Sequence, residues 1–409
     1  MKINHFKEHD VEKKPTVYDV AHEAGVSIAT VSRALRTPQS VRPNTRKAIE
    51  LAIKRLGYVP SGSAQSLAAR RTNSIGLFLP NIDELDSLTD FQLATIDKAE
   101  VVVDPPSTPS IRPDSFYFDS LLRGCELEAW RQGLSLMVNI GLGRTDADVS
   151  QLVNDMSGKV DGLIVMARSI PERVLEPLRR HLPLVMVANA PSDHEEEFDL
   201  VRVSNRKGMS ALVKHLVKAH HVSQIAYMAG PDDSPDNHKR YEGFCEGMRA
   251  CGLNPEAAPI YRGQFSQVIA CTITKSLIAQ DSLPEALVCA NDQMALGAMA
   301  ALSRAGVPVP GRVIVTGFDG ISETETTEPR ITTVRQPIVD LGRAAVITLV
   351  KRMNEPGAPP LSTELPVTVL LRESSEGPLD ALDAVDGASQ TPRNGLRTTY
   401  AAIPIVRAR

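Results

Sequence analysis

Apolar residues follow two different patterns along this chain of 409 residues. Between residues 16 and 58 they occur every three or four positions, which predicts short amphipathic helices. From residue 74 onward they form short uninterrupted runs bounded by turn residues, at 75–79, 136–140, 162–166, 184–187, 225–228, 287–289 and 313–318. Amphipathic stretches such as 119–132 and 207–219 separate most of these runs. The change of pattern predicts an all-α head and an α/β body whose parallel strands are buried between helices.

Residues 16–36, TVYDVAHEAGVSIATVSRALR, have the pattern of two helices joined by a tight turn, a helix-turn-helix. Thr16 is placed to cap the first helix, and Asp19 is placed to return the bond. Gly25 supplies the backbone freedom of the turn, and Ser27 caps the second helix. The expected apolar interior consists of Val20, Ala24, Val26, Val31 and Leu35. An ordinary helical hairpin is the alternative interpretation.

Small and basic side chains remain for the outer face of the second helix. Ala29 and Arg33 are four positions apart and share that face with Ile28. An arginine beside small apolar groups suits the major groove of DNA, where it can read guanine edges and thymine methyl groups.

A third helix is predicted within residues 41–58. Its apolar stripe, which can close a three-helix core, consists of Ile49, Ala52, Ile53 and Leu56. Gly57 ends this helix. Residues 59–71, VPSGSAQSLAARR, are small, polar and basic, so they cannot form a core of their own.

Residues 16–71 closely resemble the DNA-binding headpiece and hinge of the lactose repressor family, and the resemblance continues to about Ser374. It implies that 63–69 folds into a hinge helix on DNA, with Leu67 as a wedge in the minor groove. Relatives usually carry asparagine at Ser61, so this position departs from the family. The implied DNA-binding residues are Thr16, Tyr18, Ser27, Ile28, Ala29, Thr30, Ser32, Arg33, Arg42, Tyr58, Ser61, Ala64 and Leu67.

The same resemblance implies the domain organisation of the whole chain. The fold class is an all-α helix-turn-helix headpiece plus an α/β core of two doubly wound lobes, like periplasmic sugar-binding proteins, with three strands crossing between the lobes. The expected parts are an extension (1–15), the helix-turn-helix domain (16–60), the hinge (61–73), the two-lobed effector-binding and dimerisation domain (74–374) and a tail (375–409). Both chain ends are expected to be disordered.

Polar residues directly after the apolar runs are candidates for binding a ligand, because ligands of open α/β sheets bind beyond the carboxyl ends of the strands. Asn291 follows one run within ANDQMALGAM, and Asp319 follows another within GFDG. Arg240 lies in a family-like Gly-Pro, arginine, Gly-Phe spacing. The amide, carboxylate and guanidinium of these three residues form a set of donors and acceptors that can bind vicinal hydroxyl groups. Asp292 has two interpretations, a ligand contact or the cap of the next helix.

Two further effector-binding candidates, Asn81 and Asn189, follow other strands, but the set departs from relatives. After Val187, relatives often have an acidic residue or a glycine followed by an arginine, whereas this chain has Ala188-Asn189. The Asp-Asn pair that relatives carry before the next helix is Ser204-Asn205 in this chain. The effector therefore cannot be named from any relative. Residues 84–113 form an insertion, interpreted as a surface loop or alternatively as a lid or a dimer contact.

Charge is divided unevenly along the chain. Residues 1–71 hold 13 Lys and Arg against 6 Asp and Glu, a balance of +7, whereas the remainder holds 32 against 43, a balance of −11. A basic head is attracted to DNA phosphates, although such asymmetry can also be a plain solvated surface. With 42% hydrophobic residues, no membrane-length apolar run and no signal peptide, a cytoplasmic protein is expected.

Cysteines and histidines indicate neither a metal site nor a cofactor. The five cysteines are odd in number and lack a Cys-x-x-Cys pair, so buried thiols are expected. Within the predicted helices the nine histidines form no ligand pair of the His-x-x-x-His kind, and His220-His221 is interpreted as a turn before a strand.

Enzyme motifs are weak. Gly141-Leu142-Gly143 is only a fragment of a dinucleotide fingerprint, and Ser192-Asp193-His194 are sequence neighbours whose side chains diverge. The sequence predicts a repressor, not an enzyme, that binds operator DNA as a homodimer or a tetramer and responds to a small molecule, a sugar or a derivative of one. The alternative is a cytoplasmic sugar-binding protein or sugar-processing enzyme with an accessory DNA-binding head.

Overall fold

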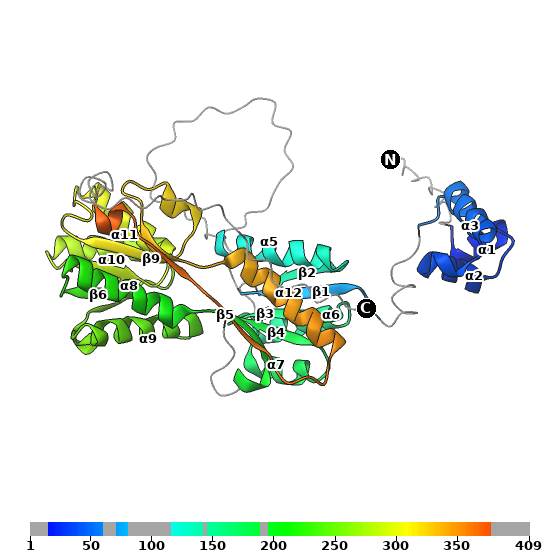
Figure 1. The fold of residues 1–409 in the computed structure, drawn as a ribbon, viewed down its shortest axis with the longest axis horizontal. Helices are drawn as coiled ribbons and strands as arrows, with labels where there is room; N and C mark the ends of the chain where they lie inside the picture. Colours follow the sequence, from blue (N-terminus) through cyan, green and yellow to red (C-terminus); the bar gives the residue numbers. More distant parts are fainter. Residues whose placement is uncertain (1–14, 60–70, 81–115, 142–144, 189–194, 378–409) are drawn as a thin grey trace, which may run out of the picture. The chain divides into compact units, whose positions relative to one another are not determined.

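The computed structural model describes residues 15–59, 71–80, 116–141, 145–188 and 195–377. It divides into two compact units, a head of the residues before Ile75 together with Gly158–Asp161, and a body of the remainder. Figure 1 shows both units. The predicted insertion, most of the hinge and nearly all of both chain ends lie outside the described residues.

The head contains the predicted helix-turn-helix and third helix, α1 (Val17–Glu23), α2 (Ile28–Arg36) and α3 (Pro43–Leu56), with a short η1 (Pro38–Ser40) that the sequence did not predict. The backbone N–H and hydroxyl of Thr16 both donate to Asp19 Oδ2, at 2.7 Å. Ser27 caps α2, its hydroxyl accepting from Thr30 N at 3.2 Å. Gly25 and Gly57 have left-handed φ angles of 63° and 61°, which glycine adopts without steric cost.

The three helices enclose one small apolar core. Val20, Val31, Ile49 and Ala52 are buried at its centre, and the partly buried side chains around it include Ala24, Val26, Leu35, Ile53 and Leu56. Every residue predicted for this interior is therefore part of it. The core fixes the outward face of α2, because a helix that buries one side must expose the other.

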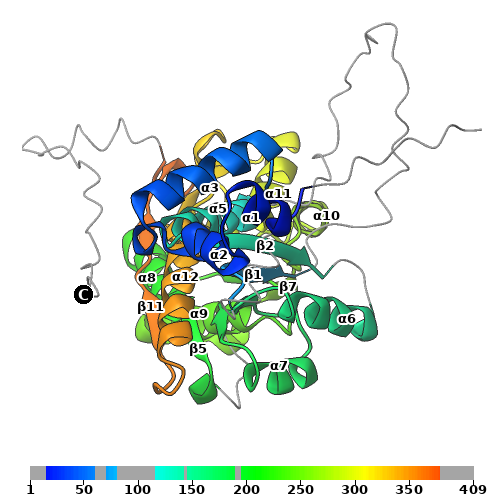
Figure 2. The same cartoon turned by 90° about the vertical axis from the view of Figure 1, so that its right-hand side faces the viewer.

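The first lobe of the body is a six-stranded sheet in the order β11-β5-β4-β3-β1-β2. Its strands are β1 (Ser74–Leu79), β2 (Ser135–Ile140), β3 (Leu163–Met166), β4 (Leu184–Val187), β5 (Asp199–Val203) and β11 (Ser362–Leu365). Its helices are α5 (Phe116–Arg131), α6 (Asp146–Ser157), α7 (Glu172–Arg179) and α12 (Ile338–Asn354). Ile75 and Leu77 of β1 face the core with α5 and α12, whereas Gly76 faces Met156 of α6. Helices therefore cover both faces of the sheet (Figures 1 and 2).

The second lobe is a six-stranded sheet in the order β12-β10-β9-β8-β6-β7, with β12 antiparallel to β10. Its strands are β6 (Ile225–Ala229), β7 (Ile260–Arg262), β8 (Ala286–Cys289), β9 (Ile314–Asp319), β10 (Thr332–Arg335) and β12 (Thr368–Leu370). Its helices are α8 (Asn205–His220), α9 (Pro235–Ala250), α10 (Gln267–Ala279), α11 (Asp292–Arg304) and α13 (Glu373–Glu376). Short η3 (Glu195–Glu197), η4 (Pro255–Ala257) and η5 (Ser322–Glu325) complete the body.

The chain passes between the two sheets three times, after β5, after β10 and after β11. This confirms the fold class and the three crossings that the family resemblance implied. Two large apolar clusters, one in each lobe, form the cores on either side of these crossings. Polar residues at the crossings consequently lie where the lobes meet.

Each of the seven apolar runs forms a strand, to within a residue or two at the ends. All five cysteines are free thiols, four of them buried, as expected. His220 ends α8 and His221 follows it with a left-handed φ of 55°, so the predicted turn before β6 is present. The expected tail boundary needs correction, since α13 extends to Glu376 and Ser375 is buried. No helix among the described residues is both long and apolar enough to cross a membrane.

Candidate DNA-binding face and effector site

The outer face of the head carries most of the predicted DNA-binding side chains. Thr16, Tyr18, Ser27, Ile28, Ala29, Arg33 and Arg42 are exposed, and Thr30, Ser32 and Tyr58 are partly buried. Tyr58 packs against the head core, and the hydroxyl of Thr30 lies 2.9 Å from that of Ser27. Ser61, Ala64 and Leu67 lie outside the described residues. The exposed residues of α2 therefore include Arg33, Ile28 and Ala29, and their contact with base edges stays a prediction.

A cluster of buried polar side chains lies at the carboxyl edge of the second sheet, next to the crossings. Arg240, on α9, donates from Nη1 to the carbonyl of Ala290 at 2.6 Å and lies 3.1 Å from Oδ1 of Asp319, the last residue of β9. Its Nε donates to Oδ1 of Asn205 at 2.9 Å. Gln336, after β10, donates from Nε2 to Asp319 Oδ1 at 2.6 Å. The predicted arginine and aspartate are thus brought into direct contact.

Aromatic rings hold the guanidinium of Arg240 in place. Its Cζ lies 4.0 Å from the ring centroid of Phe318 and 5.9 Å from that of Phe265. A cation over an aromatic face is attracted by the ring quadrupole, and the side chain is only 4% exposed. Burial, ring contacts and three polar partners fix the direction in which the arginine faces.

Asn291 and Asp292 have different structural roles from each other. Asn291 is the N-cap of α11, and its Oδ1 accepts from Met294 N at 3.0 Å. The sequence had offered Asp292 for this role, one residue too late. Asp292 instead accepts from the backbone N–H groups of Gly320 and Ile321 at 2.6 and 2.9 Å, and from the hydroxyl of Thr333 at 2.6 Å. It therefore organises the turn that carries Asp319.

Sequence reasoning did not select Asn205, Asp236 or Gln336 as site residues, although the structure adds all three to the cluster. Asn205 donates from Nδ2 to Asp236 Oδ1 at 2.8 Å and so links that carboxylate to Arg240. Oε1 of Gln336 is buried and has no hydrogen-bond partner among the described residues. For Asn205 and Gln336 the available signal was their place just after β5 and β10, where the chain changes sheets, whereas Asp236 lies in the first turn of α9. Asn81 and Asn189 lie outside the described residues, so their effector role stays a prediction.

The first lobe also faces this cluster. Burial raises the pKa of Tyr117, in the first turn of α5, and the nearby carboxylates of Asp236 and Asp319 raise it further. Farther out, Arg168 after β3 forms an ion pair with Asp233 after β6, with Nε and Oδ2 2.8 Å apart. The cluster is therefore bounded by both lobes, as a ligand site between them requires.

Several residues at or just beyond the carboxyl ends of strands have φ angles that favour glycine. Arg168, Ala188 and Asp319 have φ angles of 67°, 81° and 122°. Such conformations cost of the order of 1–3 kcal/mol and concentrate at functional sites. Their position at the edge where the lobes meet marks the same region as the polar cluster.

The two buried carboxyls predict a pH dependence of stability. Burial raises the pKa of Asp292, with the charge of Asp319 adding to the effect, and burial also raises the pKa of Asp319 although Arg240 opposes it. Above about pH 4 these two carboxyls therefore hold more protons in the folded chain than in the unfolded chain, so their contribution to stability falls as pH rises. Asp292→Asn keeps an acceptor for Gly320 N and Ile321 N, and its unfolding free energy is expected to fall less.

Urea unfolding at several pH values between about 5 and 8 tests this expectation. As pH rises, the unfolding free energy of Asp292→Asn should increase relative to that of the unchanged chain by on the order of 1 kcal/mol, the equivalent of one pKa unit. Glu285→Gln is the control, since the N–H groups of Gln224 and Ser223 hold the pKa of Glu285 below its ordinary value. The contribution of Glu285 to stability is therefore constant between about pH 5 and 8. Parallel profiles for Asp292→Asn and the unchanged chain would contradict the prediction.

Comparisons with known proteins agree with this architecture. The family described as bacterial regulatory proteins, lacI family, matches residues 16–61, and the periplasmic binding protein-like domain matches residues 213–375. The HTH-type transcriptional repressor PurR of Pasteurella multocida (strain Pm70) is 30% identical over 365 residues, 88% of this chain and 98% of that protein. The chain belongs to the lacI family of bacterial regulatory proteins. This lacI-family protein is thus a DNA-binding transcriptional regulator.

Other relatives support the assignment. Catabolite control protein A of Priestia megaterium is 28% identical over 364 residues, 88% of this chain and 99% of that protein. The lac repressor bound to ONPG in the repressed state shares 25% identity at a TM-score of 0.70, over 88% of this chain and 100% of that one. The lac repressor dimer bound to operator and the anti-inducer ONPF has a similar fold, with a TM-score of 0.72 at 24% identity. The match covers 89% of this chain and 99% of that one.

Proposed function

We propose that this lacI-family regulator is a repressor that binds operator DNA as a homodimer and is controlled by a small molecule, a sugar or a derivative, held between its lobes. The Arg240–Asp319 pair is the observation that supports this most, because buried, hydrogen-bonded charges at the meeting of two lobes can recognise hydroxyl groups. The names of similar proteins, which include a complex of the regulator CelR with cellobiose, support the same class of ligand.

A DNA-binding regulator works where the chromosome is, so a cytoplasmic location is part of the proposal. The polar cluster supports binding rather than catalysis, because Asp319 is engaged by Arg240 and Gln336. Symmetric heads require symmetric half-sites, so a roughly palindromic operator is expected. A change in the angle between the two lobes would then alter the separation of the two heads of the dimer, through the hinge residues around Leu67.

Measuring the coupling between the two sites tests the proposal. An operator selected from randomised DNA would be titrated with the full chain by fluorescence anisotropy, in the absence and presence of sugars, sugar phosphates and nucleosides. One compound is expected to change operator affinity by roughly 5- to 150-fold, and operator should change the affinity for that compound by the same factor. Saturable ligand binding without specific DNA binding would instead favour the sugar-binding alternative.

A further inference from the structure

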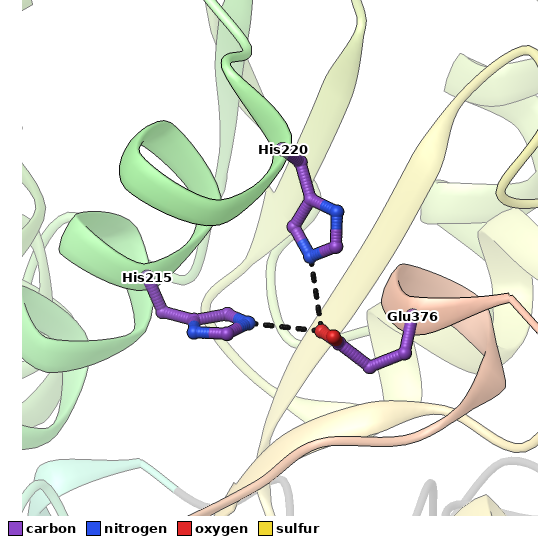
Figure 3. A group of neighbouring side chains, drawn as sticks. All are labelled: His215, His220 and Glu376. Atoms are coloured by element: carbon purple, nitrogen blue, oxygen red, sulfur yellow. Dashed lines mark hydrogen bonds and ion pairs between the residues drawn. The ribbon is translucent and has the colours of Figure 1, made fainter. Parts of the chain in front are cut away.

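A second group of polar side chains lies at the other end of α8, away from the cluster around Arg240. His215 and His220, in the last turns of α8, point toward Glu376 of α13 (Figure 3). Their Nε2 atoms lie 2.9 and 3.0 Å from the same oxygen, Oε1 of Glu376. The three potential ligand atoms all lie within 4.8 Å of one another. Two elements far apart in sequence thus bring two imidazoles and one carboxylate to a single point.

We propose that His215, His220 and Glu376 form a binding site for a divalent transition metal of the Zn²⁺ type. Imidazole nitrogen and carboxylate oxygen are ligands that Zn²⁺ prefers, at about 2.0–2.2 Å. Ligand atoms at that distance in a tetrahedral arrangement are roughly 3.3 Å apart, so the two N–O separations of 2.9 and 3.0 Å need to open by only a few tenths of an ångström.

The carboxylate is positioned by contacts that do not depend on the histidines. Ser375 donates from its hydroxyl to Glu376 Oε1 at 2.9 Å and lies 2.6 Å from the hydroxyl of Thr332. Ser374 donates to the carbonyl of Val315 at 2.6 Å, which fixes α13 against β9. Such outer contacts orient a metal-binding carboxylate and strengthen its site.

The site has room for exchange with solvent. The side chains of His215, His220 and Glu376 are 27%, 21% and 14% exposed, so they are accessible without being freely mobile. Three protein ligands leave a fourth position for water or another donor. Binding through Nε2 places each imidazole proton on Nδ1. The hydrogen bonds to Glu376 are then replaced by metal–ligand bonds, and α13 becomes attached to α8.

His238 offers a matched control. The exposed His238 lies 3.2 Å from Glu242, four residues further along α9, and this pair has no third potential metal ligand among the described residues. His238→Ala therefore removes an imidazole beside a carboxylate without touching the proposed site. Glu376→Gln is the most conservative change within the site, because the amide keeps the shape and an acceptor for Ser375 but is a much poorer metal ligand.

Titration calorimetry of the untagged full chain with Zn²⁺ tests the proposal. The unchanged chain and His238→Ala should each bind one Zn²⁺ per chain, and His215→Ala, His220→Ala and Glu376→Gln should each bind at least about 10-fold more weakly. Mg²⁺, which prefers oxygen ligands, should not compete. Absence of saturable binding by the unchanged chain, or undiminished binding by all three variants, would overturn the site.

Co²⁺ provides a measurement that needs no variant. Added to the unchanged chain, it should give a visible spectrum typical of nitrogen and oxygen ligands, and Zn²⁺ should remove that spectrum. Thiolate charge-transfer bands would instead assign the metal to cysteine and contradict the proposal. The result remains decisive even where a substituted chain does not fold.

Discussion

Arg33→Ala is expected to weaken binding to the operator by about 1–3 kcal/mol while binding to random DNA changes little. Arg33 is exposed on α2, and Ser27 fixes the start of that helix through its hydroxyl. An arginine that forks onto a guanine edge contributes to specific complexes only, whereas a phosphate contact contributes to both. Fluorescence anisotropy with operator and scrambled DNA at one salt concentration measures the two losses.

Arg55→Ala is the matched control for this experiment. Arg55 is also an exposed arginine of the head, on α3, but its Nη1 lies 3.3 Å from Glu23 in a surface ion pair. Its removal should therefore leave the ratio of specific to random binding unchanged. If Arg33→Ala weakened both DNAs equally, Arg33 would be a phosphate contact, and α2 would have to dock differently.

The apolar pattern predicted strands well where burial alone decides them. β4 (LVMV) is buried at every position and is hydrogen-bonded on both sides, so its run of apolar residues is sufficient to identify it. β5 and β10 were missed because polar residues lie in them. Asp199 begins β5 and is paired with Arg352 of α12 at 2.6 Å, and Thr332 and Thr333 of β10 bond to Ser375 and Asp292. These partners are far away in sequence, so no local pattern reveals them.

The candidate site shows the same limit. Arg240 and Asp319 could be selected because each lies in a motif after a strand. Asn205 lies between Arg240 and Asp236 because of where the chain crosses from β5 into α8, which the sequence pattern does not show. The metal-site proposal has the same origin, since His215 and His220 are five positions apart and their third partner lies 156 residues beyond His220. Tertiary geometry, not spacing, joins them.

Arg240→Ala is expected to have the largest effect in the body. Removing one partner of a buried ion pair typically costs about 3–5 kcal/mol, because the other charge is left uncompensated. Here Asp319 would lose its cation, and Asn205 and the carbonyl of Ala290 would lose a donor. Urea unfolding should show this loss. Effector affinity should fall as well, because the proposed site would lose the hydrogen-bond donors that Arg240 offers to hydroxyl groups.

Arg262→Ala is the control, since Arg262 forms an exposed pair with Asp232 at 3.0 Å and surface pairs contribute about 0–1 kcal/mol. The double variant Arg240→Met with Asp319→Asn separates stability from recognition. It removes both charges of the Arg240–Asp319 pair, so it should recover much of the lost stability, yet effector binding should remain weak. Recovery of effector binding together with stability would mean that Arg240 holds the lobe together without contacting the effector, and the candidate site would have to lie elsewhere.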